Sequence, residues 1–278
     1  MRLSSFRKPY NDRPVASLQN ETPGEAFACP GDLTVRDRLQ AVTEPGPRIL
    51  YRAMTDSDQQ PLNDDDRLAI IRVLSKPRFQ TYLNASGHDA DRAWRMYLWN
   101  ARLGEAFHLP VQTAEVGLRN SIDVVLTELF GPNWGSSHRF ESSLDDRAQQ
   151  DLVTVKKRIK NKGQQIDNGQ IVASLSFGFW VGLLHRKHYP AIWSKHLTTG
   201  FPHLPNNVTR QDVFLRAQEV NKLRNRISHH EPIIRVDISK EYGAILELLE
   251  WICPVTSILL KPHFRVSMVM RERPRPKP

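Results

Sequence analysis

The residues best suited to catalysis stand together in the segment 223–232, which reads LRNRISHHEP. It combines a guanidinium (Arg224), a carboxamide (Asn225), two imidazoles (His229 and His230) and a carboxylate (Glu231). Imidazole titrates near neutral pH and can transfer a proton, and the guanidinium presents a planar fork of donors that suits phosphate. Asn225 and His229 are four residues apart, so they are neighbours on a helix. The residue types therefore predict proton transfer beside a bound anion.

The helix that precedes this segment gives Arg224 an unusual position. Its apolar residues recur at helical spacing and form one narrow stripe, at Val213, Ala217, Val220 and Ile227. Arg224 falls in the middle of that stripe, where an arginine is unfavourable unless it is paired. A structural interpretation stays open, because histidine and arginine also favour the negative end of a helix dipole.

The spacing also sets a geometric condition on catalysis. On an ideal helix the side chains of Arg224 and His229 point about 140° apart. They can converge only if the helix loosens before Pro232, or if a second subunit completes the site.

A second group of polar residues lies far upstream, at 115–120. Glu115 and Arg119 are spaced i, i+4, and Glu115 lies beside an apolar stripe. One interpretation is a structural ion pair between the two. The other is that Glu115 orients Arg224, with Arg119 and Asn120 near the same site.

A basic run closes another expected helix and is a candidate RNA-binding patch. Its residues are Lys156, Lys157, Arg158 and Lys160. Clustered cations can bind a phosphate backbone, but cations at a helix end also suit the helix dipole and stay solvated. The histidines at 185, 188, 196 and 203 lack the spacing of a metal site, so neither a metal nor a cofactor is expected.

Composition narrows the class of protein. The chain has 278 residues, a net charge of +9 and a pI of about 9.7, which favours a polyanionic partner. Cys29 and Cys253 are far apart and form no disulfide framework, which suits a reducing cytoplasm. The first residues contain no apolar run typical of a signal peptide, and the apolar runs elsewhere are too short to span a membrane. We therefore expect a cytoplasmic protein without membrane association.

The pattern along the chain predicts an all-α fold, because alternation of period two is nearly absent. We expect a poorly ordered extension over residues 1–60, a helical domain over 61–265 and a basic, proline-rich tail over 266–278. The expected helices begin near Asn63, after Ser75, at Asp89, at Pro110, after a Ser143 cap, at Ile171, after a Thr209–Asp212 capping box, and at Ser239 with a break at Pro254.

Arg224-Asn225-x-x-x-His229 resembles the R-x4-6-H signature of the HEPN superfamily. The whole string from Leu223 to Ile233 resembles the C-terminal motif of the Abi-like (abortive-infection) proteins in that superfamily. Four earlier blocks in the same order extend the resemblance over roughly residues 68–260: Arg78-Phe79-x-x-Tyr82-Leu83, Tyr97-Leu98-Trp99-Asn100, Glu115-Val116-x-Leu118-Arg119-Asn120 and Phe177-Gly178-Phe179-Trp180.

The resemblance implies a helical bundle of HEPN type with additional N-terminal helices. It also implies a homodimer that cleaves RNA without a metal, as an abortive-infection protein or toxin in phage defence, with a possible antitoxin. His229 would then transfer the proton and Arg224 would stabilise the transition state, supported by Asn225, His230 and Glu231. The alternative is a non-catalytic helical module that binds RNA or a partner protein.

Overall fold

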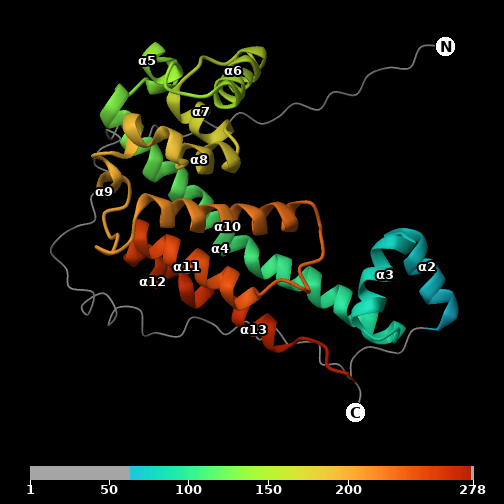
Figure 1. Ribbon diagram of the computed structural model, residues 1–278. Coiled ribbons are helices and arrows are strands. Elements are labelled where there is room, and N and C mark those ends of the chain that lie inside the picture. The colour runs from blue at the N-terminus through green and yellow to red at the C-terminus, as the bar shows by residue number, and fades with distance from the viewer. Residues whose placement is uncertain (1–62, 277–278) are drawn as a thin grey trace, which may run out of the picture. The chain divides into compact units, whose positions relative to one another are not determined.

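A computed structural model describes residues 63–276, and every regular element in this part of the chain is a helix (Figure 1). The predicted all-α class is confirmed. The extension expected over residues 1–60 lies outside the described residues. Within them, no helix is both long and apolar enough to cross a membrane.

The longest element is α4, Ala90–Phe130, which begins at the Asp89 cap and ends at Gly131 with φ +86°. The prediction of two helices meeting at Pro110 is wrong, because α4 runs through Pro110 without a break. A proline inside a helix costs about 3 kcal/mol. The buried positions Leu103, Phe107, Val111 and Ala114 keep helical spacing on both sides of Pro110, so continuous packing offsets that cost.

α10, Arg210–Ser228, packs against α11 (Ile238–Ile252), α4 and α8 (Phe177–Leu183), as Figure 1 shows. The predicted capping box is present, since the backbone N–H of Thr209 donates to Asp212 Oδ2 at 2.7 Å and the Thr209 hydroxyl accepts from the backbone of Asp212. The predicted break at Pro254 is also present, because α12 (Pro254–Leu260) starts a new helix there.

In the described part of the chain, two short helices precede α4. α2 spans Asp64–Leu74, and α3 spans Lys76–Ala85 and packs on α4 through buried Phe79 and Tyr82. Ser75, with φ +69°, makes the turn between them.

Short helices fill the segment between α4 and α10. They are η2 (Trp134–Ser136), α5 (His138–Glu141), α6 (Asp146–Asn161), α7 (Asn168–Ser174), α8, η3 (Arg186–His188), η4 (Tyr189–Trp193) and α9 (Leu197–Gly200). Two predictions are corrected here. Asp145, not Ser143, caps α6, because its carboxylate accepts from the backbone of Ala148. The helix expected from Ile171 to Leu184 is divided into α7 and α8, because Ser176 caps a new start.

The chain after residue 260 continues in η5 (Lys261–His263) and α13 (Val266–Arg271). α13 lies where the sequence predicts a tail. Val266 and Val269 are buried against α4, and Trp99 Nε1 donates to the Val269 carbonyl at 2.7 Å. The two valines are three residues apart, so one helical face carries both into the core.

Candidate functional site

α10 ends in a Schellman motif that displays the histidines. The His230 N–H donates to the Ile227 carbonyl at 3.0 Å and the Glu231 N–H to the Arg226 carbonyl at 2.8 Å. His230 occupies the left-handed position of this motif with φ +55°, where glycine is usual. His229, His230 and Glu231 are consequently exposed on the surface.

Two hydrogen bonds fix the chain where it leaves α10. Arg78 Nη1 in α3 donates to the His230 carbonyl at 2.7 Å. The Ile233 N–H donates to Asn100 Oδ1 in α4 at 2.8 Å, and Ile233 itself is buried. The end of α10 is therefore held against both α3 and α4.

Arg224 is half-buried and faces α4, where its Nε lies 3.3 Å from Glu115 Oε2. The predicted contact between Glu115 and Arg224 is therefore present. Arg224 Nη1 also donates to Asn225 Oδ1 at 3.4 Å. The Arg224 side chain is 39% exposed and that of Glu115 23%, so the pair contributes at most about 1 kcal/mol to stability. The contact holds the Nε edge of the guanidinium toward α4.

Arg119 lies one turn beyond Glu115 and is less satisfied. Its Nε is buried, and within the described part of the chain it has no hydrogen-bond partner. A buried donor without an acceptor costs about 1–3 kcal/mol, so an incoming anion that pairs with it is favoured. The neighbouring Asn120 is half-buried.

A cavity of about 350 Å³ lies between α4 and α10 at this place. Its polar lining is rich in donors, and comprises His108, Gln112, Glu115, Arg119, Arg224 and Ser228. Two guanidinium groups and one carboxylate thus line the cavity, a balance of charge that suits a small anion such as a phosphate group.

A larger cavity of about 830 Å³ lies between α3, α4 and the end of α10. His230 and Glu231 line it, together with Arg78. His108 and Ile227 line both cavities, so the two are neighbours. His108 is not among the residues predicted from the sequence, although it lies two turns before Glu115 and so shares its face of α4.

The structure thus brings some of the candidate residues together and separates others. Arg224, Glu115 and Arg119 line the smaller cavity, and Asn225 accepts from Arg224 beside it. His230 and Glu231 line the larger one. His229 lines neither of these two. The helix does not loosen before it, because the His229 N–H still donates to the Asn225 carbonyl at 2.9 Å. Within one chain, Arg224 and His229 therefore face different surroundings.

Comparison with protein-family models, curated proteins and solved structures finds no match. The assignment of a function therefore rests on the residues and their geometry.

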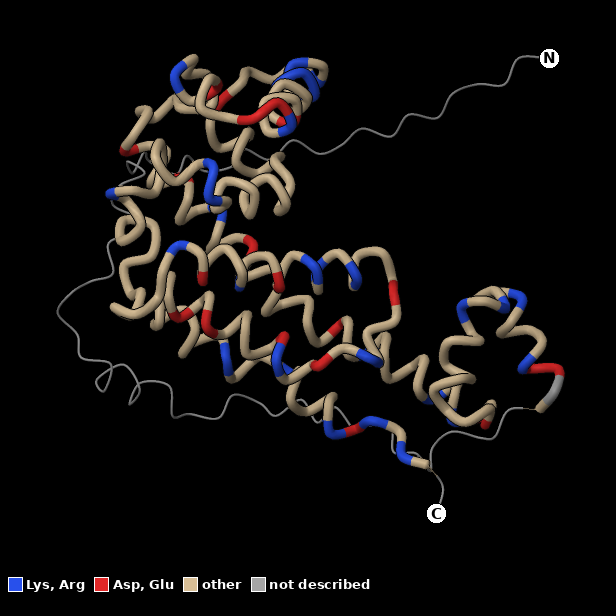
Figure 2. Tube along the Cα trace, in the orientation of Figure 1, with Lys and Arg blue, Asp and Glu red and all other residues tan. Residues whose placement is uncertain are grey.

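Basic residues gather at the end of α6 (Figure 2). Lys156 is half-buried and bonds Glu141, which neutralises it. Lys157, Arg158 and Lys160 are exposed. Of the four predicted RNA-binding residues, Lys156 is therefore paired with Glu141, and the other three present their charges at the surface.

The histidines outside α10 serve other contacts. His188 is buried, and its pKa is lowered to about 4, mainly by burial and to a lesser extent by the nearby charge of Lys187. It is therefore neutral at neutral pH. His196 Nδ1 lies 3.3 Å from Glu128. Among residues 63–276, no group of three or more histidine, cysteine or acidic side chains is placed to hold a metal ion.

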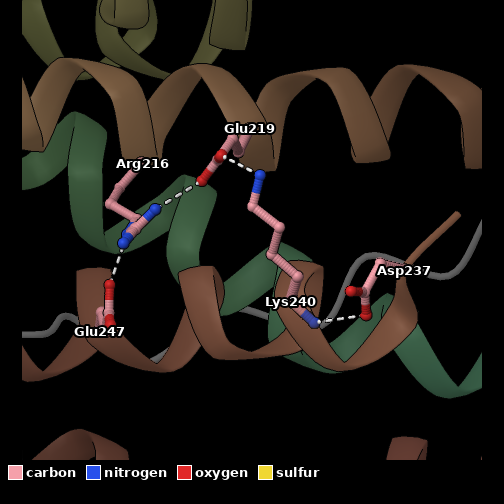
Figure 3. A network of polar contacts seen from close by, with 5 residues as sticks. All are labelled: Arg216, Glu219, Asp237, Lys240 and Glu247. Carbon is pink, nitrogen blue, oxygen red and sulfur yellow. Dashed lines mark hydrogen bonds and ion pairs between the residues drawn. The ribbon is translucent and has the colours of Figure 1, made fainter.

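A separate ion-pair network joins the middle of α10 to α11 (Figure 3). Arg216 bonds Glu247 in α11 and Glu219 in α10, and Lys240 Nζ lies 3.0 Å from the other oxygen of Glu219. Asp237 caps α11 by accepting from the backbone of Lys240. The hydrogen bond with Glu247 raises the pKa of Arg216. Burial opposes ionisation of Glu219, but its hydrogen bonds with Lys240 and Arg216 outweigh burial and lower its pKa.

Proposed function

We propose that the C-terminal end of α10 is the active site of a metal-independent endoribonuclease. The observation that carries the proposal is the smaller cavity, which Arg224, paired with one carboxylate, lines together with Arg119. Arg119 Nε has no hydrogen-bond partner among the residues that the structure describes. Two cations against one acid leave capacity for the phosphate of an RNA strand. The histidines that could transfer protons follow within six residues of Arg224.

The residues match the needs of RNA cleavage in kind. A base removes the proton of a ribose 2′-hydroxyl, whose oxygen then attacks the adjacent phosphorus, and an acid protonates the departing 5′-oxygen. His229 is the proposed proton-transfer residue, with His230 and Glu231 in support. Arg224 stabilises the charged phosphorane, held in place by Glu115 and aided by Asn225.

The separation of Arg224 from His229 in one chain is part of the proposal. A second copy of the chain would bring its own His229 to the cavity that holds Arg224, so that a homodimer completes each site. The HEPN-type bundle, the abortive-infection or toxin role in phage defence and the possible antitoxin are proposed from the sequence resemblance alone.

The same separation favours one other function. If no second subunit supplies His229, the basic surface and the cavity suit a non-catalytic helical module that binds RNA or a partner protein.

A cleavage assay separates the two functions. Purified protein is incubated with single-stranded RNA in EDTA, beside His229→Ala and Arg224→Ala. His203→Ala and Arg226→Ala serve as controls, since both residues are exposed and neither lines the two cavities. Cleavage by the wild type and both controls, lost in both site variants, supports the enzyme. RNA binding without cleavage by any of the proteins supports the module.

A mixture of the two inactive variants tests the shared site. Random exchange makes half of the dimers mixed, and each mixed dimer keeps one intact site of two, so about a quarter of the activity returns. If the mixture stays inactive although the subunits exchange, Arg224 and His229 are not contributed by different chains.

A further inference from the structure

A third cavity, of about 490 Å³, lies between the end of α6 and α7, in a part of the fold that the proposed active site does not use. Its lining has two cations, four neutral hydrogen-bonding side chains and two apolar side chains: Arg158, Lys162, Asn161, Gln164, Gln170, Ser174, Ile159 and Ala173. None of the eight is acidic, although a carboxylate accompanies the guanidinium groups of the smaller cavity.

The backbone on both sides of this cavity is fixed in place. α6 ends at Asn161, the N–H of its cap residue Lys162 donates to the Ile159 carbonyl at 3.1 Å, and Gly163 turns the chain away with φ +71°. On the other side, Asn168 at the start of α7 donates to the Pro132 carbonyl at 2.6 Å and accepts from the Gly135 N–H at 3.1 Å. The cavity is therefore built before a ligand arrives, which lowers the entropy lost on binding.

Gln170 carries the most specific signal in the cavity. Its Oε1 is buried, and within the described residues it has no hydrogen-bond partner. Its backbone N–H donates to Asp167 Oδ1 at 2.8 Å, which holds the residue at the first turn of α7. An unsatisfied acceptor in a cavity that two cations also line favours a ligand with both a hydroxyl or amine donor and negative charge.

The sugar–phosphate backbone of RNA has both properties. Arginine, lysine, serine, asparagine and glutamine are the side chains that commonly contact phosphate and sugar. The ribose 2′-hydroxyl supplies a donor that DNA lacks. The carbonyl end of α6 disfavours an anion on its backbone, so the phosphate contacts fall to Arg158 and Lys162.

We propose that this cavity binds the sugar–phosphate backbone of single-stranded RNA, with Arg158 and Lys162 on the phosphates and Gln170 accepting from a ribose 2′-hydroxyl. The choice of RNA as the ligand rests on the proposed function. The exposed Lys157 and Lys160 extend the basic surface along α6, while Lys156 is neutralised by Glu141 and takes no part. The cavity is then a second binding site for the RNA strand, remote in sequence from Arg224.

Binding is measured by fluorescence anisotropy in EDTA, in an Arg224→Ala background that prevents cleavage. The probes are one single-stranded sequence as RNA, as DNA and as 2′-O-methyl RNA. We expect RNA to bind about fivefold more tightly than either probe without a 2′-hydroxyl donor, as for one hydrogen bond. If RNA and 2′-O-methyl RNA bind equally well to the protein with its cavity residues unaltered, the proposal is overturned.

Two variants assign the preference to this cavity. Gln170→Leu keeps the side-chain volume and loses the acceptor, so RNA affinity falls to that for DNA while DNA affinity is unchanged. The double variant Arg158→Gln/Lys162→Gln weakens binding of all three probes. It also reduces the slope of log affinity against log salt by about 1.4, which corresponds to two lost phosphate contacts on a single strand.

The matched control is Lys195→Gln/Lys261→Gln, which removes two exposed cations elsewhere and leaves the RNA preference unchanged. An equal loss for RNA and DNA in Gln170→Leu, or an unchanged salt slope in the cavity double variant, overturns the proposal. So does competition by polyglutamate that matches competition by RNA, because the cavity would then hold an acidic protein.

The outcomes separate this proposal from the one for α10. An RNA preference that depends on Gln170, in a protein that cleaves no RNA even with Arg224 intact, supports this cavity and removes the enzyme. Cleavage whose KM is unaffected by the cavity variants leaves the enzyme standing and removes this cavity.

Discussion

Two arginines of the same helix, Arg216 and Arg224, have contrasting surroundings. Arg216 bonds the carboxylates of Glu219 and Glu247 (Figure 3). Arg224 contacts the single carboxylate of Glu115 at 3.3 Å, and its other hydrogen bond goes to the neutral amide of Asn225. The charge of Arg216 is matched within the fold, whereas that of Arg224 is only partly matched.

The surroundings of the two arginines extend this difference. The network of Arg216 ties α10 to α11, so its charges hold two helices together. Arg224 lines a cavity together with Arg119, whose Nε has no hydrogen-bond partner within residues 63–276. A fully paired arginine is expected to stabilise the fold, and a partly paired one beside a cavity is available to an anionic ligand.

The largest effect is expected from exchanging the two arginines for glutamine. Arg224→Gln should lower the rate of RNA cleavage about 100-fold or more, since a charged donor to the transition state is lost. Its free energy of unfolding should change by less than about 1 kcal/mol. Arg216→Gln should retain the cleavage rate and lose about 1–2 kcal/mol of stability. Single-turnover cleavage and urea denaturation measure the two quantities.

Equal losses of activity in both arginine variants would remove the distinction between them. A stability loss in Arg224→Gln as large as that in Arg216→Gln would show that Arg224 is a structural ion pair.

The carboxylate partners give a second, smaller contrast. Glu115→Gln should lower the cleavage rate about tenfold, because the guanidinium of Arg224 is less firmly oriented. Glu219→Gln should leave the rate unchanged, since Glu219 acts within the structural network. Unchanged stability together with unchanged activity in Glu115→Gln would exclude Glu115 from the site.

The sequence predicted much of this arrangement where local and tertiary preferences agree. The capping box at Thr209 is a local pattern, and it is present. The position of Arg224 on an apolar stripe implied a partner, and Glu115 is that partner. Both predictions use side-chain types whose chemistry leaves few alternatives.

Other features depended on contacts that the sequence does not show. Pro110 predicted a helix start, but packing on both sides keeps α4 continuous. Residues 266–271 carry basic and proline-rich neighbours typical of a tail, yet Trp99 and the core of α4 hold them as a helix. The α6–α7 cavity joins residues from two helices and the loop between them, and the buried oxygen of Gln170 is visible only in three dimensions.

The left-handed conformation of His230 permits a stability test at the site itself. A non-glycine residue at positive φ is strained, so His230→Gly should raise the free energy of unfolding by about 1 kcal/mol. For a domain of this size the melting temperature should rise by about 2–4 °C. If His230 also assists proton transfer, the cleavage rate falls while stability rises. A stabilised variant with full activity would limit the role of His230 to ending the helix.

The smallest expected effect is the pH dependence of the Arg216 network. The folded-state pKa of Glu219 is lowered, because its hydrogen bonds with Lys240 and Arg216 outweigh the opposing effect of burial. A carboxylate with a lowered pKa stabilises the fold fully above its unfolded pKa of about 4.3, and the stabilisation is lost as pH falls through the folded pKa. The difference in unfolding free energy between the wild type and Glu219→Gln, about 1 kcal/mol at pH 7, should therefore shrink below about pH 4.

The unfolding free energy of Glu219→Gln is subtracted from that of the wild type at each pH. The subtraction cancels the titration of groups that both proteins share, such as Glu241, whose pKa is raised by burial. The same subtraction for Glu115→Gln should give a smaller difference at pH 7, because within the described residues Glu115 pairs with Arg224 alone, at 3.3 Å. A difference for Glu115 as large and as pH-dependent as that for Glu219 would make both carboxylates structural. The contrast between the two arginines would then have no consequence for function.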